Sequence, residues 1–239
     1  MTASPLCRGV PAGIAALAVV SLLALPALPA RGQSETQSET QSREPASAPE
    51  AQPAAPDEAA SERAAAADYV LGDIALGDPD APVTVYEYAS FTCPHCATFH
   101  MQTFPEFREK YIDTGKVRFV LREVYFDQYG LWASMVARCG GEQGFYPLVD
   151  AFLGSQSNWT RAPDIGHAIQ QVGRRAGLSA ERLQKCLSDR AFAKELLATY
   201  QENREADEVQ STPTFIVDGE KHTGAMSFEE FAAIIDAAM

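Results

Sequence analysis

Two cysteines separated by two residues lie where the sequence pattern changes from strand to helix. They form the motif Cys93-Pro94-His95-Cys96, which follows the apolar run Val83 to Phe91. Residues i and i+3 of a helix share one face, with β-carbons about 5–6 Å apart, so the two sulfur atoms are within reach of a disulfide bond. Because proline is favoured at the first helical position, Pro94 places Cys93 at the N-cap. Unpaired N–H groups and the positive helix end stabilise an anion there, so Cys93 is the predicted thiolate.

Residues 1–32 have the layout of a secretory signal peptide. One charged residue, Arg8, precedes the apolar run Val10 to Ala24, and small residues follow it. The apolar run is short for a membrane span. Cleavage fits after Ala30 or after Gly32, and the sequence does not choose between these positions. If the signal is not cleaved, it acts as a membrane anchor instead.

Residues 33–67 have the composition of a disordered linker. The doublet SETQSETQS is followed by four prolines among Ala, Glu and Ser, with almost no large apolar side chain. Such a segment buries too little surface to offset its chain entropy. If the signal stayed in the membrane, this linker would have a reach of roughly 30–35 Å.

The remaining residues 68–239 are enough for a single domain with one core. Removal of the signal takes away Arg8 and Arg31, which leaves 17 basic against 32 acidic residues and a net charge of −15. This acidity argues against nucleic acid as a partner. Cys7 leaves as well, so four cysteines remain in an exported chain, where disulfides persist.

The first part of this domain has the pattern of strand, helix and strand. The β-branched and aromatic run Val83 to Ala89 predicts a buried strand. The helix that starts at Pro94 and ends at Gly115 is expected to kink near Phe104, because Pro105 lies inside it. The alternating run Lys116 to Phe126 predicts a second strand, parallel to the first.

Helical patterns then occupy about residues 128–206, where Ser179 and Asp189 are predicted to begin two of the helices. The other expected features are helix breaks at 140–141, 161–163, 177 and 187–189, strands at 214–217 and 221–223, and a closing helix at 227–238. This order predicts an α/β domain that is split by a helical insertion.

Phe91 to Cys96 after a strand, the helical insertion, and Thr212-Pro213-Thr214-Phe215 before a strand together resemble the DsbA family of bacterial thiol-disulfide oxidoreductases. The resemblance spans about residues 69–239. It implies a thioredoxin-like fold with an inserted helical domain, in which a cis-proline loop packs beside the redox pair. By that likeness Pro213 is the cis-proline and Thr212 precedes it. The buried acidic residue of the family, six positions before the first cysteine, corresponds to Glu87.

A CxxC motif by itself has three interpretations: a redox pair, half of a zinc site, or chance. Zinc would need a second close pair of ligands, whereas Cys139 and Cys186 are 47 positions apart and no histidines are paired at metal-site spacing. We therefore expect no metal. The preceding strand, the proline at the first helical position and the downstream Thr-Pro-Thr favour a redox pair.

Two further residues have predicted roles beside the thiols. A protonated His95 would add positive charge near Cys93 and lower its pKa; the alternative is an inert exposed histidine. Glu87 lies among Val and Tyr, where a buried carboxylate is costly unless it is partnered or protonated. Its place beneath the helix predicts proton exchange with Cys96; the alternative is a solvated strand residue. His100, among the other histidines, is interpreted as structural or exposed.

Cys139 and Cys186 lie in the helical insertion without CxxC partners. We expect them to form a structural disulfide. It would close a loop of about 48 residues and stabilise the fold by up to roughly 4 kcal/mol in the chain-entropy model. The alternatives are two buried free thiols or a redox-sensitive bond.

The sequence thus predicts a thiol-disulfide oxidoreductase of the periplasm, which passes its Cys93-Cys96 disulfide to reduced, partly folded exported proteins without an external cofactor. The family resemblance implies re-oxidation by a membrane quinone-linked oxidase. Because the linker lacks an apolar interface, we expect a monomer. One alternative is isomerisation or reduction by the same fold, whose related isomerases are dimers with a separate N-terminal domain. The other is a non-catalytic, chaperone-like peptide binder with an inert disulfide.

Overall fold

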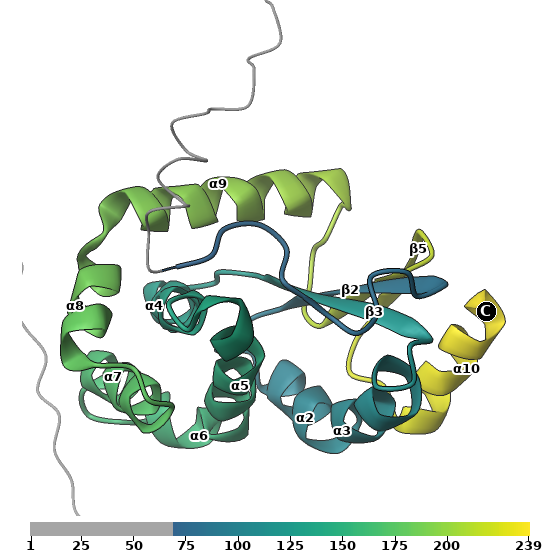
Figure 1. The fold of residues 1–239 in the computed structure, drawn as a ribbon, viewed down its shortest axis with the longest axis horizontal. Coiled ribbons are helices and arrows are strands. Elements are labelled where there is room, and N and C mark those ends of the chain that lie inside the picture. Colours follow the sequence, from purple (N-terminus) through teal and green to yellow (C-terminus); the bar gives the residue numbers. More distant parts are fainter. Residues whose placement is uncertain (1–68) are drawn as a thin grey trace, which may run out of the picture. The chain divides into compact units, whose positions relative to one another are not determined.

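The computed structural model describes residues 69–239, so the signal predicted at 1–32 and the linker predicted at 33–67 lie outside the described residues. One mixed sheet forms the centre of this part (Figure 1). Its strand order is β1-β3-β2-β4-β5; β2 and β3 are parallel, and the other neighbours are antiparallel. The strands are β1 (Ala75–Leu76), β2 (Val83–Ala89), β3 (Val117–Glu123), β4 (Thr214–Val217) and β5 (Glu220–Thr223).

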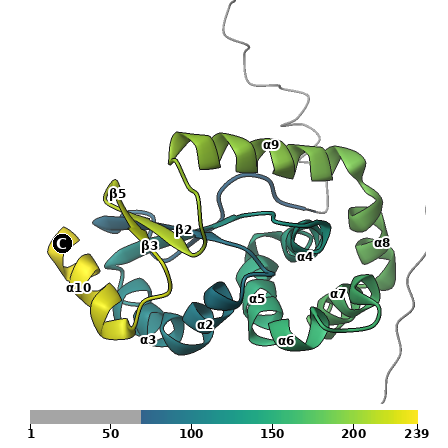
Figure 2. The same cartoon turned by 180° about the vertical axis from the view of Figure 1, so that it is seen from behind.

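Helices α2 (Pro94–Gln102), α3 (Phe104–Phe107) and α10 (Phe228–Ala238) cover one face of the sheet (Figures 1 and 2). The expected kink is confirmed, since the predicted helix is interrupted at Thr103, which separates α2 from α3. Pro105 lies in the first turn of α3, where its missing N–H costs no helical hydrogen bond. A π-helical turn, η1 (Arg108–Ile112), follows.

Six helices fill the chain between β3 and β4, where the helical insertion was expected. Ser179 and Asp189 are N-caps as predicted, because their side chains accept hydrogen bonds from the N–H groups of Arg182 and Phe192. None of the helices in residues 69–239 is long and apolar enough to cross a membrane. The six helices are α4 (Gln128–Arg138), α5 (Gly141–Gly154), α6 (Gln156–Trp159), α7 (Ile165–Arg175), α8 (Ala180–Ser188) and α9 (Arg190–Ala206).

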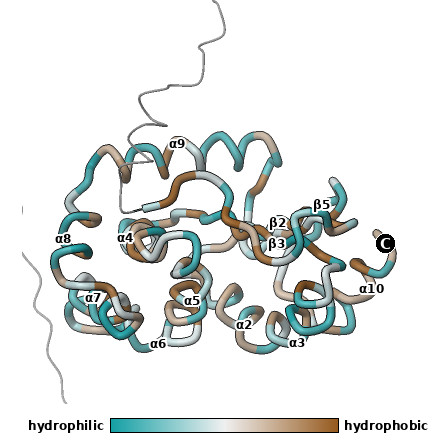
Figure 3. Tube along the Cα trace, viewed as in Figure 1, coloured by the Kyte–Doolittle hydropathy of each residue, from teal (hydrophilic) through white to brown (hydrophobic). Residues whose placement is uncertain are grey.

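The apolar core lies on both faces of the sheet, and Figure 3 shows apolar residues gathered along β2 and β3. Between the sheet and α2, α3 and α10, aromatic rings pack against one another; Phe99, for example, lies 4.6 Å from Phe215 and 5.3 Å from Phe231 between ring centroids. On the other face Tyr88 and Ile216 pack in a cluster that includes Tyr200 of α9. Each buried aromatic side chain contributes about 1.5–3 kcal/mol.

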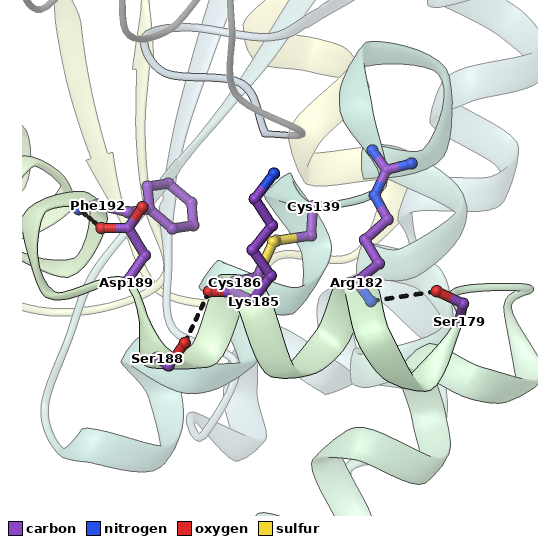
Figure 4. The surroundings of a disulfide bond; sticks show 8 residues. All are labelled: Cys139, Ser179, Arg182, Lys185, Cys186, Ser188, Asp189 and Phe192. Carbon is purple, nitrogen blue, oxygen red and sulfur yellow. Dashed lines mark hydrogen bonds between the residues drawn. A yellow bond between two sulfur atoms is a disulfide. The ribbon is translucent and has the colours of Figure 1, made fainter.

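The predicted disulfide between Cys139 and Cys186 is present and joins the end of α4 to α8 (Figure 4). The Cα atoms of the two cysteines are 6.5 Å apart, and both residues are buried. Met135 and Phe192 belong to the same apolar cluster. The bond therefore holds two helices of the insertion together, and it lies in a different buried cluster from Cys93 and Cys96.

Candidate active site

Cys93 is the N-cap of α2, and Pro94 occupies the first helical position, as the sequence predicts. The loop after β2 brings Cys93 into place, since its N–H donates to the carbonyl of Ser90 over 3.1 Å. Cys93 is 8% exposed and Cys96, one turn further into the helix, is fully buried. Both are free thiols in the structure. An attacking group from solvent therefore meets Cys93 first.

The surroundings lower the pKa of the Cys93 thiol to about 5. The largest cause is a hydrogen bond from the Cys96 thiol, which outweighs the opposing effect of desolvation. Hydrogen bonds from Thr212 and from the backbone N–H groups of Cys96 and His95 lower the pKa further. These N–H groups belong to the first turn of α2, which has no intrahelical acceptors for them. Cys93, which keeps a small exposed fraction, is thus a thiolate at neutral pH.

The pKa of Cys96 is raised well above its usual range. The first cause is its hydrogen bond to Cys93, which keeps the proton on Cys96; burial and the negative charge of Glu87 add to it. A single proton is therefore held by the sulfur of Cys96, and the sulfur of Cys93 carries the negative charge.

The loop before β4 places a cis peptide beside the thiols. The Thr212-Pro213 bond is cis, and Pro213 is buried. The carbonyl oxygen of Thr212 lies 3.5 Å from Cys93 Sγ, although the two residues are 119 positions apart. The Thr212 hydroxyl has no partner in the described residues apart from its contact with the Cys93 sulfur. The predicted redox pair and cis-proline loop are therefore brought together.

Glu87 is fully buried in the middle of β2, opposite Leu121 and Phe215, so the alternative of a solvated strand residue is wrong. Its Oε2 lies 2.7 Å from Nε2 of His100 on α2. His100 was expected only to be structural or exposed, and the structure instead makes it the partner of Glu87. The spacing in the sequence could have indicated this role, because His100 lies four residues after Cys96 and shares its helix face.

His95 is exposed, and its backbone N–H contributes to the low pKa of Cys93. A contribution from its imidazole ring stays a prediction. The other histidines lie outside this site: His167 on α7 contacts Gln171, and His222 lies on β5. Within residues 69–239, no group of three or more His, Cys, Asp or Glu side chains is placed to hold a metal ion.

Gln156 and Asp127 position the loop that carries Cys93, and the sequence did not reveal either. The buried Gln156 amide of α6 donates to the carbonyls of Phe91, at 2.8 Å, and Cys93, at 2.9 Å. Asp127 accepts a 2.9 Å hydrogen bond from Thr92 and caps α4. The only local signal was Asp127 as a capping residue before a helix. The insertion thus holds the motif directly.

The described chain is similar to known proteins over most of its length. A family model described as Thioredoxin matches residues 70–237. A Rickettsia bellii protein named "Putative protein-disulfide oxidoreductase" is 36% identical over 168 residues, which are 70% of this chain and 64% of that protein. This chain therefore matches less than two thirds of that relative's length.

Two solved structures resemble the described fold. The crystal structure of alpha-DsbA1 from Wolbachia pipientis has a TM-score of 0.66 and 28% identity, covering 71% of this chain and 92% of the other. A protein-disulfide isomerase from Novosphingobium aromaticivorans has a TM-score of 0.62 and 25% identity, covering 70% and 96%. The family model covers β2, the CxxC motif, the insertion and the cis-proline loop together. The chain belongs to the thioredoxin family and, within it, to the DsbA-like proteins.

Proposed function

We propose that this protein is a thiol-disulfide oxidoreductase that donates its Cys93-Cys96 disulfide to reduced, partly folded proteins. The observation that carries the proposal is the contrast between the two thiols. Cys93 is partly accessible with a pKa of about 5, and Cys96 is buried with a raised pKa. One sulfur is a stable leaving group, and the other holds a proton. The adjacent Thr212 backbone offers a carbonyl to an extended peptide.

The reaction conserves atoms and electrons in two exchanges. A substrate thiolate attacks Cys93 Sγ of the oxidised pair, the bond between Cys93 and Cys96 breaks, and Cys96 leaves with the bonding electrons and takes up a proton. The second thiolate of the substrate attacks the substrate sulfur of this mixed disulfide, and Cys93 leaves as a thiolate. The substrate is oxidised by two electrons, and the enzyme pair is reduced.

The stability of the Cys93 thiolate drives this direction. With a pKa of about 5, Cys93 is ionised at pH 7. The two pKa units between 5 and 7 correspond to about 2.7 kcal/mol in favour of the reduced pair. For a two-electron couple this makes the disulfide more oxidising by roughly 60 mV.

The proposal includes the location and partners expected from the sequence. Residues 1–32 would direct export to the periplasm, where exported proteins with free thiols are the substrates. The step needs no cofactor beyond the Cys93-Cys96 disulfide, and a membrane quinone-linked oxidase would restore it. The buried disulfide between Cys139 and Cys186 supports an oxidising compartment. We propose that the protein acts as a monomer.

Disulfide isomerisation is the second candidate, because the chain resembles the Novosphingobium protein-disulfide isomerase. The low pKa of Cys93 favours the oxidase, since a good leaving group shortens the life of the mixed disulfide in which rearrangement occurs.

One set of measurements tests the proposal. The purified protein is equilibrated in glutathione buffers, and its rates with a reduced unfolded protein and a scrambled one are compared. We expect an oxidising potential, rapid oxidation of the reduced protein and slow repair of the scrambled one. A Cys93-Cys96 bond that resists glutathione would indicate an inert binder, and rapid repair would indicate an isomerase.

A further inference from the structure

Cys96 must exchange a proton in every cycle, yet its side chain is fully buried. The pair formed by Glu87 and His100 lies next to it, between the centre of β2 and the inner face of α2. The side chains of this pair are 0% and 2% exposed, respectively. Because Cys96 and His100 are four residues apart on α2, both face the sheet where Glu87 lies.

Each member of this pair has a second polar atom without a hydrogen-bond partner in the described residues. These atoms are Oε1 of Glu87 and Nδ1 of His100. Buried polar atoms are nearly always hydrogen-bonded, and leaving one unpaired is unfavourable. A pair that only filled the core would lose stability through both open positions. A pair that passes protons needs one open position at each end.

A pocket of about 360 Å³ between α2, α3 and α5 reaches His100 from the molecular surface. Its walls include Phe104, whose ring lies 4.7 Å from the imidazole ring, and the charged residues Arg108 and Asp150. A cavity of this volume has room for several water molecules. The pKa of Asp150 is raised, because desolvation outweighs the opposing charges of His100 and Arg108. His100 therefore influences a charged group at the pocket wall as well as Glu87.

We propose that His100 is a positioning residue that orients the Glu87 carboxyl group and connects it to this pocket, so that Cys96 exchanges protons with water by a route separate from the Cys93 surface. The inference rests on the proposed function. When Cys96 leaves as a thiolate, a proton moves from the Glu87 carboxyl to Cys96 Sγ. His100 then takes up a proton from water in the pocket, so that the charged Glu87 carboxylate of the reduced protein is paired with a protonated imidazole. Re-oxidation runs the same transfers in reverse.

The titratable groups around the proposed proton route through Glu87 and His100 come from four elements. Glu87 on β2 faces His100 directly, Cys96 lies on the same helix, Arg108 belongs to η1, and Asp150 lies on α5. Burial and, to a lesser extent, the negative charge of Glu87 raise the pKa of Tyr146 on α5. The Tyr146 hydroxyl stays protonated, however, and donates to backbone carbonyls. Tyr146 therefore takes no part in the transfer.

The test separates the chemistry of the two thiols. Reduced protein is mixed with oxidised glutathione, samples are quenched in acid, and mass spectrometry counts the Cys93-glutathione adduct and the Cys93-Cys96 disulfide between pH 5 and pH 9. Formation of the adduct reports on Cys93. Its conversion to the internal disulfide requires Cys96 to lose its proton.

We expect His100→Gln to form the adduct at the normal rate and to convert it about 10- to 100-fold more slowly, with a changed pH profile, since acid-base groups commonly contribute at least this much. His167→Gln, on α7, is the matched control and should behave like the unchanged protein. Added imidazole should restore conversion in His100→Ala by entering the pocket. Normal conversion in His100→Gln across the pH range, or no rescue of a folded His100→Ala, would overturn the role of His100.

The role of the pocket in proton exchange is tested by substituting two glycines of α5. A β-carbon on Gly154, which lines the pocket, or on Gly144, which does not, meets no atom within 4 Å. Gly154→Leu should therefore slow conversion by narrowing the pocket, whereas Gly144→Leu should not. Equal rates in these two variants would refute the route. If the unchanged protein forms the adduct but never the internal disulfide, the proposed function itself fails.

Discussion

The carbonyl oxygen of Thr212 lies 3.5 Å from the Sγ atom of Cys93. The cis-proline loop, late in the sequence, therefore packs against the cysteine that caps α2, early in the sequence. The Thr212 hydroxyl also helps to lower the Cys93 pKa. Two chain segments thus share control of one thiolate.

Replacement of Thr212 tests this control. Thr212→Val removes the hydroxyl and should raise the Cys93 pKa above about 5, whereas Thr212→Ser should leave it near the original value. The thiolate absorbance of the reduced protein, followed between pH 3 and pH 9, measures the change. Identical titration curves for the two variants would contradict the hydrogen bond.

The two thiols should differ in reactivity. Near pH 6 an alkylating reagent should modify Cys93 alone in the reduced protein, because Cys93 is ionised and accessible and Cys96 is protonated and buried. Peptide mapping after brief labelling identifies the modified residue. Comparable labelling of Cys96 in folded protein would show that the assignment is wrong.

Acid should remove the extra stability of the reduced form. The folded pKa of Cys93, about 5, is below the unfolded value of roughly 8.5, so its ionisation stabilises the reduced fold fully above pH 8.5 and not at all well below pH 5. Between pH 7 and pH 4 the reduced protein should lose about 2–3 kcal/mol relative to the oxidised protein. Denaturant unfolding of both forms measures this difference, and parallel pH profiles would rule it out.

Gln156 should act on the site through the backbone. Gln156→Ala removes both hydrogen bonds to the carbonyls of Phe91 and Cys93 and should cost about 1–3 kcal/mol of stability. It should also weaken the selective labelling of Cys93. Gln184→Ala, at an exposed position of α8, is the control. An equally small change in both variants would mean that the loop holds its shape without the insertion.

The buried ion pair between Arg138 and Glu123 should contribute to the fold rather than to the chemistry. Arg138 makes two 2.6 Å hydrogen bonds to Glu123 and also holds the carbonyls of Val70 and Gly72. Glu123→Ala leaves a buried charge unpaired and should destabilise the protein by about 3–5 kcal/mol. Breaking the exposed pair with Glu106→Ala should change little. Thermal unfolding and Cys93 labelling separate stability from chemistry.

Removal of the second disulfide should affect stability alone. Cys139→Ala combined with Cys186→Ala removes a bond between residues 47 positions apart and should lower stability by up to about 4 kcal/mol. The bond lies in a different buried cluster from the CxxC motif, so the glutathione equilibrium of Cys93 and Cys96 should persist. A shifted equilibrium would reveal coupling between the two disulfides.

Local interactions were sufficient for the sequence to predict several features of this protein. The N-cap position of Cys93 follows from Pro94 beside it, and the helix starts at Ser179 and Asp189 follow from side chains that bond to N–H groups three residues away. The buried strand β2 follows from its β-branched and aromatic residues, and the helix interruption before Phe104 follows from Pro105. The place of Thr212 was indicated only by family resemblance.

Tertiary structure decided which residues meet across the chain. The two-residue strand β1 was missed because so short an edge strand has no pattern of its own and exists through pairing with β3. Gln156 reaches Cys93 from 63 residues away, because the insertion packs its helices beside α2. His100 contacts Glu87 because α2 packs against β2 with the His100 side chain directed toward the centre of the sheet. Such contacts depend on strand order and on how layers pack, which no pattern within a short stretch of sequence contains.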